Sequence, residues 1–418
     1  MCNTTLCNTI MCKKYYTKLC IKIYIYIFAS KIIIITTMKK ISFIFGTAVS
    51  DYNFIGREEE TKRLIANFTE GVNTILISPR RIGKTSLVKH VKKIVDKKYG
   101  KDVIVIFFDM FACKTEYDFY NALSAAVLKQ TASNVDKWME NAKDFLVRLT
   151  PKISFSPDNN NDFSLSLGIT PKTHSPEQVL ALVENIAQRR GKRIVICIDE
   201  FQQLGELPDS LTIQKRLRTA WQHQQYTSYC LFGSKMHMMN SIFQRRNVPF
   251  YQFGDTIFLS KIPSEKWIDY ITQHFEDRNK HISKDLAKKI CNAVDNYSSY
   301  VQQLAWLLFI KINEGEKATN SLLNLAINDL LDNNEALFMQ QIETLSSYQL
   351  NFLRAIASGH HSQLGEKTIR EDFNLGSPSN ITRLKTTLIG KDLIELRNRN
   401  MLYITDPVFE LWLQRRIL

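Results

Sequence analysis

Continuous apolar runs alternate with amphipathic segments between residues 54 and 258. The runs TILIS, VIVIFFD, RIVICID and YCLFGS are rich in β-branched residues and do not alternate with polar ones, as is typical of strands buried on both faces of a parallel sheet. Between them, segments such as LVKHVKKIVDKKYG repeat apolar residues at helical spacing. SPEQVLALVENIAQRRGKR does the same, with Ser175 as N-cap and Pro176 at the first helical position. The pattern predicts an α/β fold with a doubly wound parallel sheet.

The pattern changes in three places, which together predict the domain organisation. ISFS and FSLSL alternate apolar with polar residues around SPDNNND, which predicts a hairpin inserted at about residues 150–168, with a disordered insert as the alternative. Residues 264–340 are helical throughout, which predicts a small helical lid after a core of residues 38–263. Residues 341–418 give three short helices and then the strands LIELRNRN and NMLYIT, the order of a winged helix.

The first 37 residues form a separate segment. IKIYIYIFASKIIIITT is apolar but is interrupted by Lys31, so it falls short of the roughly 20 clean residues that a membrane helix needs. We interpret residues 1–37 as an upstream extension before Met38, with an apolar anchor as the alternative. We therefore expect a cytoplasmic protein without a membrane partner.

Composition narrows the class of protein. The chain has 418 residues, 44% hydrophobic and 23% charged, which favours a globular protein of two or three domains. Its formal charge of +14 is compatible with nucleic acid or anionic surfaces as partners. Eight cysteines without a C-x-x-C pair argue against a disulfide framework or a zinc site.

The stretch SPRRIGKTSL follows a predicted strand and opens a predicted helix, which is the context of a phosphate-binding loop. Backbone N–H groups and the helix dipole would face the phosphates. Lys84 would reach the β- and γ-phosphates of ATP, and the Thr85 hydroxyl would hold Mg²⁺. Ser78 stands where G-x-x-x-x-G-K-[ST] has its first glycine, a change that costs little unless φ is positive. The residues predicted to bind the nucleotide here are Pro79, Arg80, Arg81, Ile82, Gly83, Lys84, Thr85 and Ser86.

Acidic residues follow a second buried run. Asp199 and Glu200 end RIVICIDE, and ligands of open α/β sheets bind at the carboxyl ends of strands. Asp199 would accept the water ligands of Mg²⁺ and Glu200 would polarise the attacking water, although the pair could also cap the next helix. Ser234, after YCLFG, could bond the γ-phosphate or the attacking water, or be a turn serine. Asp109 ends a further run at the same edge, as a supporting group or a helix cap.

With these motifs, the chain from about residue 41 to 418 resembles the archaeal-type AAA+ ATPases, a branch of P-loop ATPases close to the signal-transducing NTPases. The matching segments are FIGREEE, PRRIGKTSL, VICIDEFQQL, LFGSKMHMM and DPVFELWL. The resemblance implies an ATPase core, a small helical lid and a C-terminal winged helix. It also implies that Ile55, Gly56 and Arg57 lie beside the adenine, and that Ser234 occupies the first sensor position.

The chain departs from the family pattern in two places. Where relatives carry G-x-P-x-Y in the lid, this chain has Asn296 and Ser298 in place of the glycine and proline, so the resemblance does not carry a nucleotide contact over to the lid. Relatives often have an arginine in the segment that corresponds to PFYQFGDTIFL, which has none here. Arg245 and Arg246, just upstream, are candidates for an arginine finger in an oligomer, or surface charges.

The predicted winged helix carries basic residues in the places that contact DNA in such domains. Arg383 and Lys385 lie near the start of the predicted recognition helix, and Arg397 and Arg399 lie towards the wing. Recognition helices contact base edges and basic wings contact phosphates. These residues are therefore candidate DNA contacts, and a winged helix that binds protein, or another part of this chain, is the alternative.

Together the motifs predict an ATP-binding protein and a Mg²⁺-dependent ATP hydrolase, with turnover that is slow or depends on a partner. It would act as a nucleotide-driven switch coupled to the winged helix. A homo-oligomer or a protein partner fits the same sequence. The alternative is a non-catalytic DNA-binding or regulatory module that uses ATP as a structural ligand.

Overall fold

The structure is a computed structural model that describes residues 43–49, 51–131, 156–157, 163–164, 175–397 and 401–418. The predicted extension 1–37 lies outside the described residues, as does Arg399. Of the predicted hairpin, only β3 (Ser156–Pro157) and β4 (Phe163–Ser164) are described, and they pair antiparallel. No helix among the described residues is long and apolar enough to span a bilayer.

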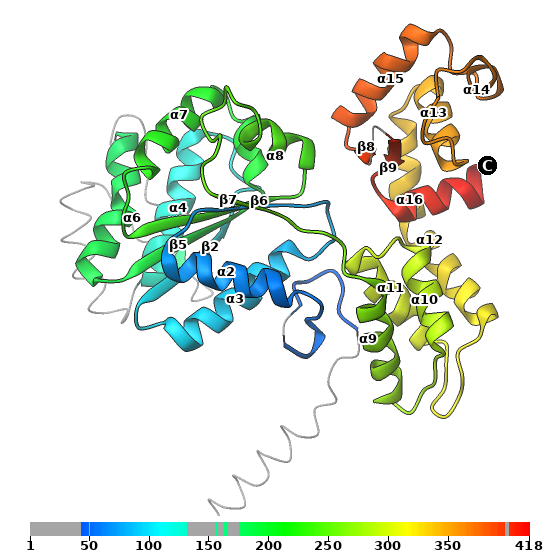
Figure 1. The fold of residues 1–418 in the computed structure, drawn as a ribbon, viewed down its shortest axis with the longest axis horizontal. Coiled ribbons are helices and arrows are strands. Elements are labelled where there is room, and N and C mark those ends of the chain that lie inside the picture. The colour runs from blue at the N-terminus through cyan, green and yellow to red at the C-terminus, as the bar shows by residue number, and fades with distance from the viewer. Residues whose placement is uncertain (1–42, 50, 132–155, 158–162, 165–174, 398–400) are drawn as a thin grey trace, which may run out of the picture. The chain divides into compact units, whose positions relative to one another are not determined.

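A five-stranded parallel sheet forms the centre of the α/β core (Figure 1), which confirms the predicted fold class. The strand order is β2-β5-β6-β1-β7. Each paired strand runs parallel to its neighbours. The strands are β1 (Thr74–Ile77), β2 (Val103–Asp109), β5 (Arg193–Asp199), β6 (Thr227–Gly233) and β7 (Asp255–Phe258).

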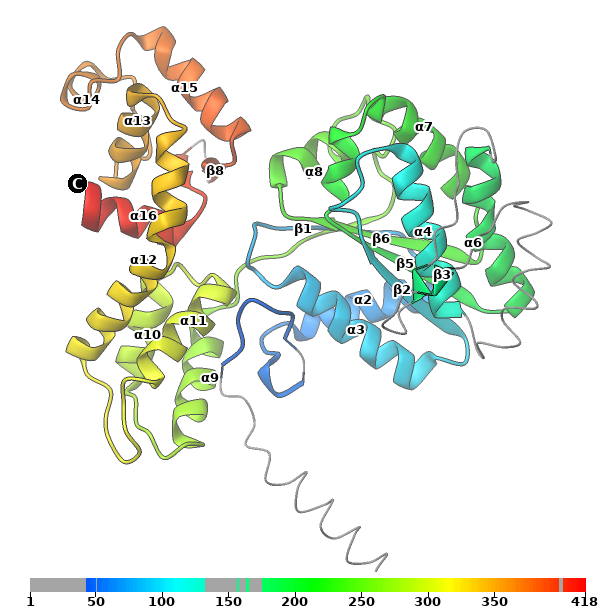
Figure 2. The same ribbon diagram turned by 180° about the vertical axis from the view of Figure 1, so that it is seen from behind.

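Helices cover both faces of this sheet (Figures 1 and 2) because successive strand residues bury opposite sides. Leu76 packs in the hydrophobic cluster that includes α2 and α3, whereas Ile75 and Ile77 pack in the cluster of the other face. One face carries α2 (Glu58–Glu70) and α3 (Lys84–Tyr99). The other carries α4 (Glu116–Thr131), α6 (Pro176–Arg190), α7 (Ser210–Trp221) and α8 (Met236–Phe243). Ser175 caps α6 in a capping box, as the sequence predicts.

Two shorter helical turns flank the ends of core elements. Asp51–Asn53 precedes α2, and Phe201–Glu206 follows β5 directly. The chain thus turns sharply at the carboxyl end of β5, where Glu200 has a left-handed backbone with φ 51°.

Four helices follow the core, in the segment that the sequence predicts as a lid. They are α9 (Ser264–Glu276), α10 (Lys284–Ala293), α11 (Ser298–Phe309) and α12 (Asn320–Glu343). Ser283 and Thr319 cap α10 and α12 by accepting a backbone N–H. The buried face of these helices is part of one continuous hydrophobic cluster that also includes the α3 side of the sheet.

The C-terminal segment has the element order of a winged helix. It consists of α13 (Ser347–Ala357), α14 (Lys367–Asp372), α15 (Pro378–Gly390), the antiparallel pair β8 (Ile394–Arg397) and β9 (Met401–Ile404), and α16 (Pro407–Trp412). A π-helical turn, Leu413–Ile417, follows. The predicted recognition helix corresponds to α15.

Candidate functional site

The candidate site lies at the carboxyl edge of the sheet, where three predicted motifs meet. In the parallel register, Ile77 of β1 pairs with Gly233 of β6, and Asp109 of β2 pairs with Asp199 of β5. The loops that leave these strands therefore start from the same edge. The phosphate loop, the acidic pair and Ser234 are brought together in this way.

A cavity of about 710 Å³ opens at this edge. Most of the sequence-predicted nucleotide residues line it, whereas Gly56 and Pro79 are not among its lining residues. Asp109 also lines the cavity, and its carboxylate accepts the Phe111 N–H at 2.8 Å. The predicted residues along the cavity are Ile55, Arg57, Arg80, Arg81, Ile82, Gly83, Lys84, Thr85, Ser86, Asp199, Glu200 and Ser234.

Lys84 lies buried at the first position of α3, where the phosphate loop ends, with 6% of its surface exposed. Its Nζ donates to the Ser78 and Pro79 carbonyl oxygens, both at 3.0 Å, and to Ser78 Oγ at 3.2 Å. Burial lowers the pKa of Lys84 to about 8, against the attraction of Glu200 and Asp199. An anion in the cavity would therefore meet a strongly desolvated cation.

Left-handed backbone occurs in this loop at Arg81 (φ 66°) and Gly83 (φ 98°), and not at Ser78. Ser78 thus has a backbone that any L-residue adopts, which explains why glycine is not needed there. A Cβ at Gly83 would meet no atom within 4 Å, so its φ and not space favours glycine at that position.

Thr85 and Asp199 meet directly. Thr85 Oγ1 donates to Asp199 Oδ2 at 2.7 Å, and burial raises the pKa of Asp199. A hydroxyl and a carboxylate side by side are the hard oxygen donors that suit Mg²⁺. No cluster of three or more His, Cys, Asp or Glu able to hold a metal occurs in the described part of the chain. These donors fit Mg²⁺ that takes its remaining ligands from phosphates and water.

Glu200 is held by two neighbours. Ser234 Oγ donates to its Oε2 at 2.9 Å, and Gln202 Nε2 donates to the same oxygen. Its own N–H donates to Asp199 Oδ1 at 2.9 Å. Gln202 is buried; it lies in the matching segment VICIDEFQQL, but no role was predicted for it from the sequence. Ser234 is therefore a hydrogen-bond donor to Glu200.

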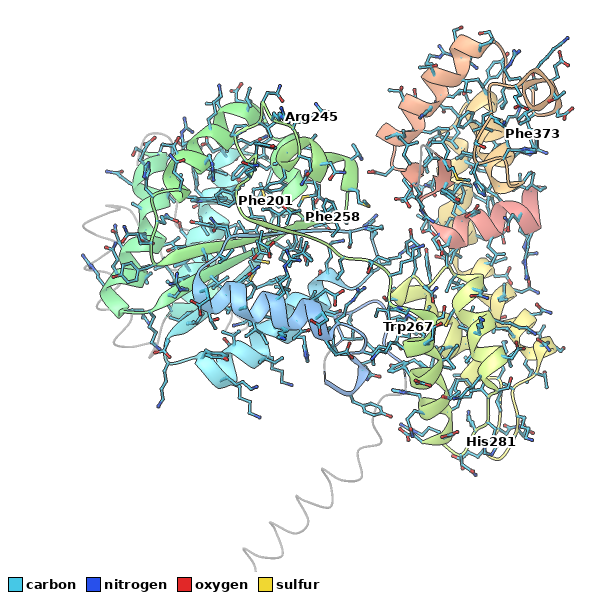
Figure 3. The ribbon with its side chains drawn as sticks, viewed as in Figure 1. Phe201, Arg245, Phe258, Trp267, His281 and Phe373 are labelled. Carbon is cyan, nitrogen blue, oxygen red and sulfur yellow. The ribbon has the colours of Figure 1, made fainter. Side chains whose placement is uncertain are left out.

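The lid and the segment before α2 also line the cavity, although the sequence did not predict them. Ser298, Ser299 and Gln302 of α11 and Trp267 of α9 (Figure 3) are lining residues. Ile44 N donates to Gln302 Oε1 at 3.3 Å, and Val49 N donates to Ser86 Oγ at 3.0 Å. These contacts are long-range, and the loop FGTAVSD gives no sequence pattern that could predict them.

Arg57 also contacts the phosphate loop. It is 3% exposed, donates to the Ile82 carbonyl at 3.2 Å and pairs with Glu60 at 3.0 Å. Ser298 Oγ donates to the same Ile82 carbonyl at 3.2 Å. The substituted lid motif therefore still contacts the loop.

The candidate DNA contacts separate into two groups. Arg383 on α15 is exposed, and Lys385 is partly exposed. Arg397, in contrast, pairs with Asp295 of the lid at 3.1 Å and with its strand neighbour Glu395. Its guanidinium therefore has acidic partners within the chain. Arg245 (Figure 3) and Arg246 are exposed after α8.

Comparisons with known proteins agree with this geometry. Residues 54–236 match the family described as "ATPase domain predominantly from Archaea", and residues 336–415 match a "Probable winged helix domain". No curated protein matches the sequence.

Solved structures share the fold at low sequence identity. The Walker-type ATPase PABY2304 of Pyrococcus abyssi is 16% identical, with a TM-score of 0.63, over 90% of this chain and 100% of that chain. The ORC2 protein of Aeropyrum pernix, in ADPNP–ADP complexes, is 14% identical, with a TM-score of 0.51, over 88% of this chain and 97% of that chain. The chain thus combines a segment that matches the archaeal ATPase domain with a C-terminal segment that matches a winged helix domain, on a fold that it shares with these solved structures.

Proposed function

We propose that this protein binds ATP with Mg²⁺ in the cavity at the sheet edge and hydrolyses it, and that the nucleotide state is transmitted to the winged helix. The observation that carries the proposal is the meeting of Lys84, Thr85, Asp199 and Glu200 at one 710 Å³ cavity. One site thus contains the groups that would position the phosphates, bind the metal and activate the attacking water.

The phosphate loop is suited to a polyphosphate. The first turn of α3 leaves backbone N–H groups without helical partners, and these favour an anion together with the helix dipole. Lys84 now donates to neutral carbonyl oxygens. Phosphate oxygens would replace them as stronger, charge-assisted acceptors. Bound Mg²⁺, held by Thr85 and Asp199, would offset the charge of the phosphates.

Glu200 is the proposed general base. Ser234 and Gln202 fix its carboxylate by hydrogen bonds, so it can accept a proton from a water that attacks the γ-phosphate. Ile55 and Trp267 line the same cavity and provide an apolar wall for the base of the nucleotide.

The test compares Lys84→Ala and Glu200→Gln in the full chain, with Lys97→Ala on the exposed end of α3 as the matched control. We expect Lys84→Ala to weaken ATP binding by about 10- to 100-fold, because it removes charge-assisted hydrogen bonds. Glu200→Gln should keep binding and lower kcat by about 100-fold or more. Calorimetric titration and phosphate release measure these effects. Unchanged binding in Lys84→Ala, or unchanged hydrolysis in Glu200→Gln, would refute the assigned roles.

DNA is the second proposed ligand, through the N-terminal half of α15. The supporting observation is the exposure of Arg383, whose guanidinium donates to Asn380 Oδ1 at 3.0 Å on the same helix. Affinity for duplex DNA should fall steeply with salt, and Arg383→Ala should reduce that slope by about one. The alternative is a non-catalytic module, which would release no phosphate above background. Measuring the rate of phosphate release with and without DNA tests this alternative.

A further inference from the structure

One carboxylate of the winged helix reaches the phosphate loop. Asp406 Oδ2 is ion-paired with Nη1 of Arg81, which belongs to the loop. The same oxygen accepts the Tyr300 hydroxyl of the lid at 2.6 Å. The Arg81 guanidinium lies 4.5 Å from the centre of the Tyr300 ring. Loop, lid and winged helix therefore converge on one charged group.

Asp406 cannot follow Arg81 if the loop moves. Its second oxygen, Oδ1, accepts the N–H groups of Val408 and Phe409 at 2.9 and 3.2 Å and so caps α16. Arg81 is fixed at its backbone, where its carbonyl accepts the Ser299 N–H at 3.1 Å. The ion pair can therefore persist only while the winged helix stays at the loop.

Arg81 also lines the nucleotide cavity, whereas Asp406 is not among the lining residues. A γ-phosphate in this cavity would weaken the ion pair between Arg81 and Asp406 in two ways. Its oxygens compete for the guanidinium, which binds phosphate in a bidentate manner. Its negative charge also repels the nearby carboxylate. A diphosphate has no third phosphate and disturbs the pair less.

The strength of the pair suits such competition. The Arg81 and Asp406 side chains are 35% and 30% exposed, and pairs this accessible to solvent contribute little to stability. A ligand with several negative charges can therefore displace one partner.

We propose that Asp406 is a specificity-determining residue that opposes triphosphate binding by holding Arg81, and that a bound triphosphate breaks this contact between the phosphate loop and the winged helix. The inference rests on the proposed function, since it requires a nucleotide in the cavity. Because coupling between two sites is reciprocal, loss of the Asp406 charge must raise the affinity for the triphosphate.

The test uses the full chain and the change Asp406→Asn, which removes the charge and keeps an oxygen to cap α16. Dissociation constants for Mg²⁺–AMP-PNP and Mg²⁺–ADP are measured by calorimetry. We expect the ratio of the AMP-PNP constant to the ADP constant to fall about threefold to tenfold. Tyr300→Phe keeps the ring and removes only the hydroxyl, and should change the ratio in the same direction by less. Asp372→Asn, at an exposed position of α14, is the charge-matched control.

The circular dichroism spectrum of Asp406→Asn should match that of the wild type, so that a change in the ratio reports the lost charge and not unfolding. Equal changes for both nucleotides, or no change in the ratio, would overturn the proposal while leaving the nucleotide site intact. A wild-type chain that binds neither nucleotide would overturn the proposed function as well.

Discussion

The sheet edge and the junction between lid and winged helix use charged residues in different ways. At the sheet edge, Lys84 and Asp199 are 6% and 7% exposed, and each is matched by several hydrogen bonds. At the junction, the Arg397 and Asp295 side chains, which pair with each other, are 26% and 45% exposed. Burying a charged side chain costs free energy, so buried charges occur mainly where function requires them. Half-exposed ion pairs contribute little to stability and can change partners easily.

The difference predicts large effects of substitution at the edge and small ones at the junction.

The largest effect is expected at Asp199. Asp199→Asn should lower Mg²⁺-dependent ATP hydrolysis by about 100-fold, because the carboxylate is the proposed metal ligand opposite Thr85. Asp109→Asn, at the same edge, is the matched control and should lose less than about tenfold, since its amide oxygen can still accept the Phe111 N–H. Phosphate release measured over a range of Mg²⁺ concentrations compares the two. Equal losses of activity in the two variants would contradict the proposed role of Asp199 in metal binding, because both residues lie at the same edge of the sheet.

The second effect is a pH dependence of nucleotide binding. Burial lowers the pKa of Lys84 to about 8, below its unfolded value, so the empty site loses its ammonium as pH rises through 8. Affinity for AMP-PNP should therefore fall by up to about tenfold per pH unit above 8. For the same reason, the cost of the buried ammonium to folding is present below pH 8 and is relieved at higher pH. Titrations at pH 7, 8 and 9 test this, and a flat profile would contradict the assignment.

The smallest effect is expected at the junction, at Glu410. Burial raises the pKa of Glu410 to about 7, partly offset by Arg397. The folded state thus binds a proton more tightly than the unfolded state, and the stability this gives is lost as pH rises towards 7. Glu410→Gln should therefore stabilise the chain by about 1 kcal/mol at pH 8 and leave it unchanged at pH 4.5. Thermal melting at both pH values measures this, and destabilisation at pH 8 would show that the carboxylate is needed as an ion-pair partner.

The sequence predicted those parts of the site that follow directly from a strand. The apolar runs before Ser78 and Asp199 identify buried strands, and the parallel register then brings Lys84, Thr85 and Glu200 together. The winged helix could also be predicted, because the apolar residues of its helices and strands repeat at the spacing typical of each.

What the sequence could not predict depends on distant segments that return to the core. The contact between Arg81 and Asp406 joins positions 325 residues apart, and that between Ile44 and Gln302 joins positions 258 apart. Such contacts are set by how the lid and winged helix pack, and no local pattern records them. The ion pair between Arg397 and Asp295 was not predicted for the same reason, since the two residues are far apart in the sequence.

Ser78 has a wider consequence. Its φ is not positive, and its hydroxyl accepts a hydrogen bond from Lys84. Serine can therefore replace glycine at the start of such a loop and contribute a hydrogen bond to the lysine. A sequence pattern that requires the leading glycine would therefore exclude chains of this kind.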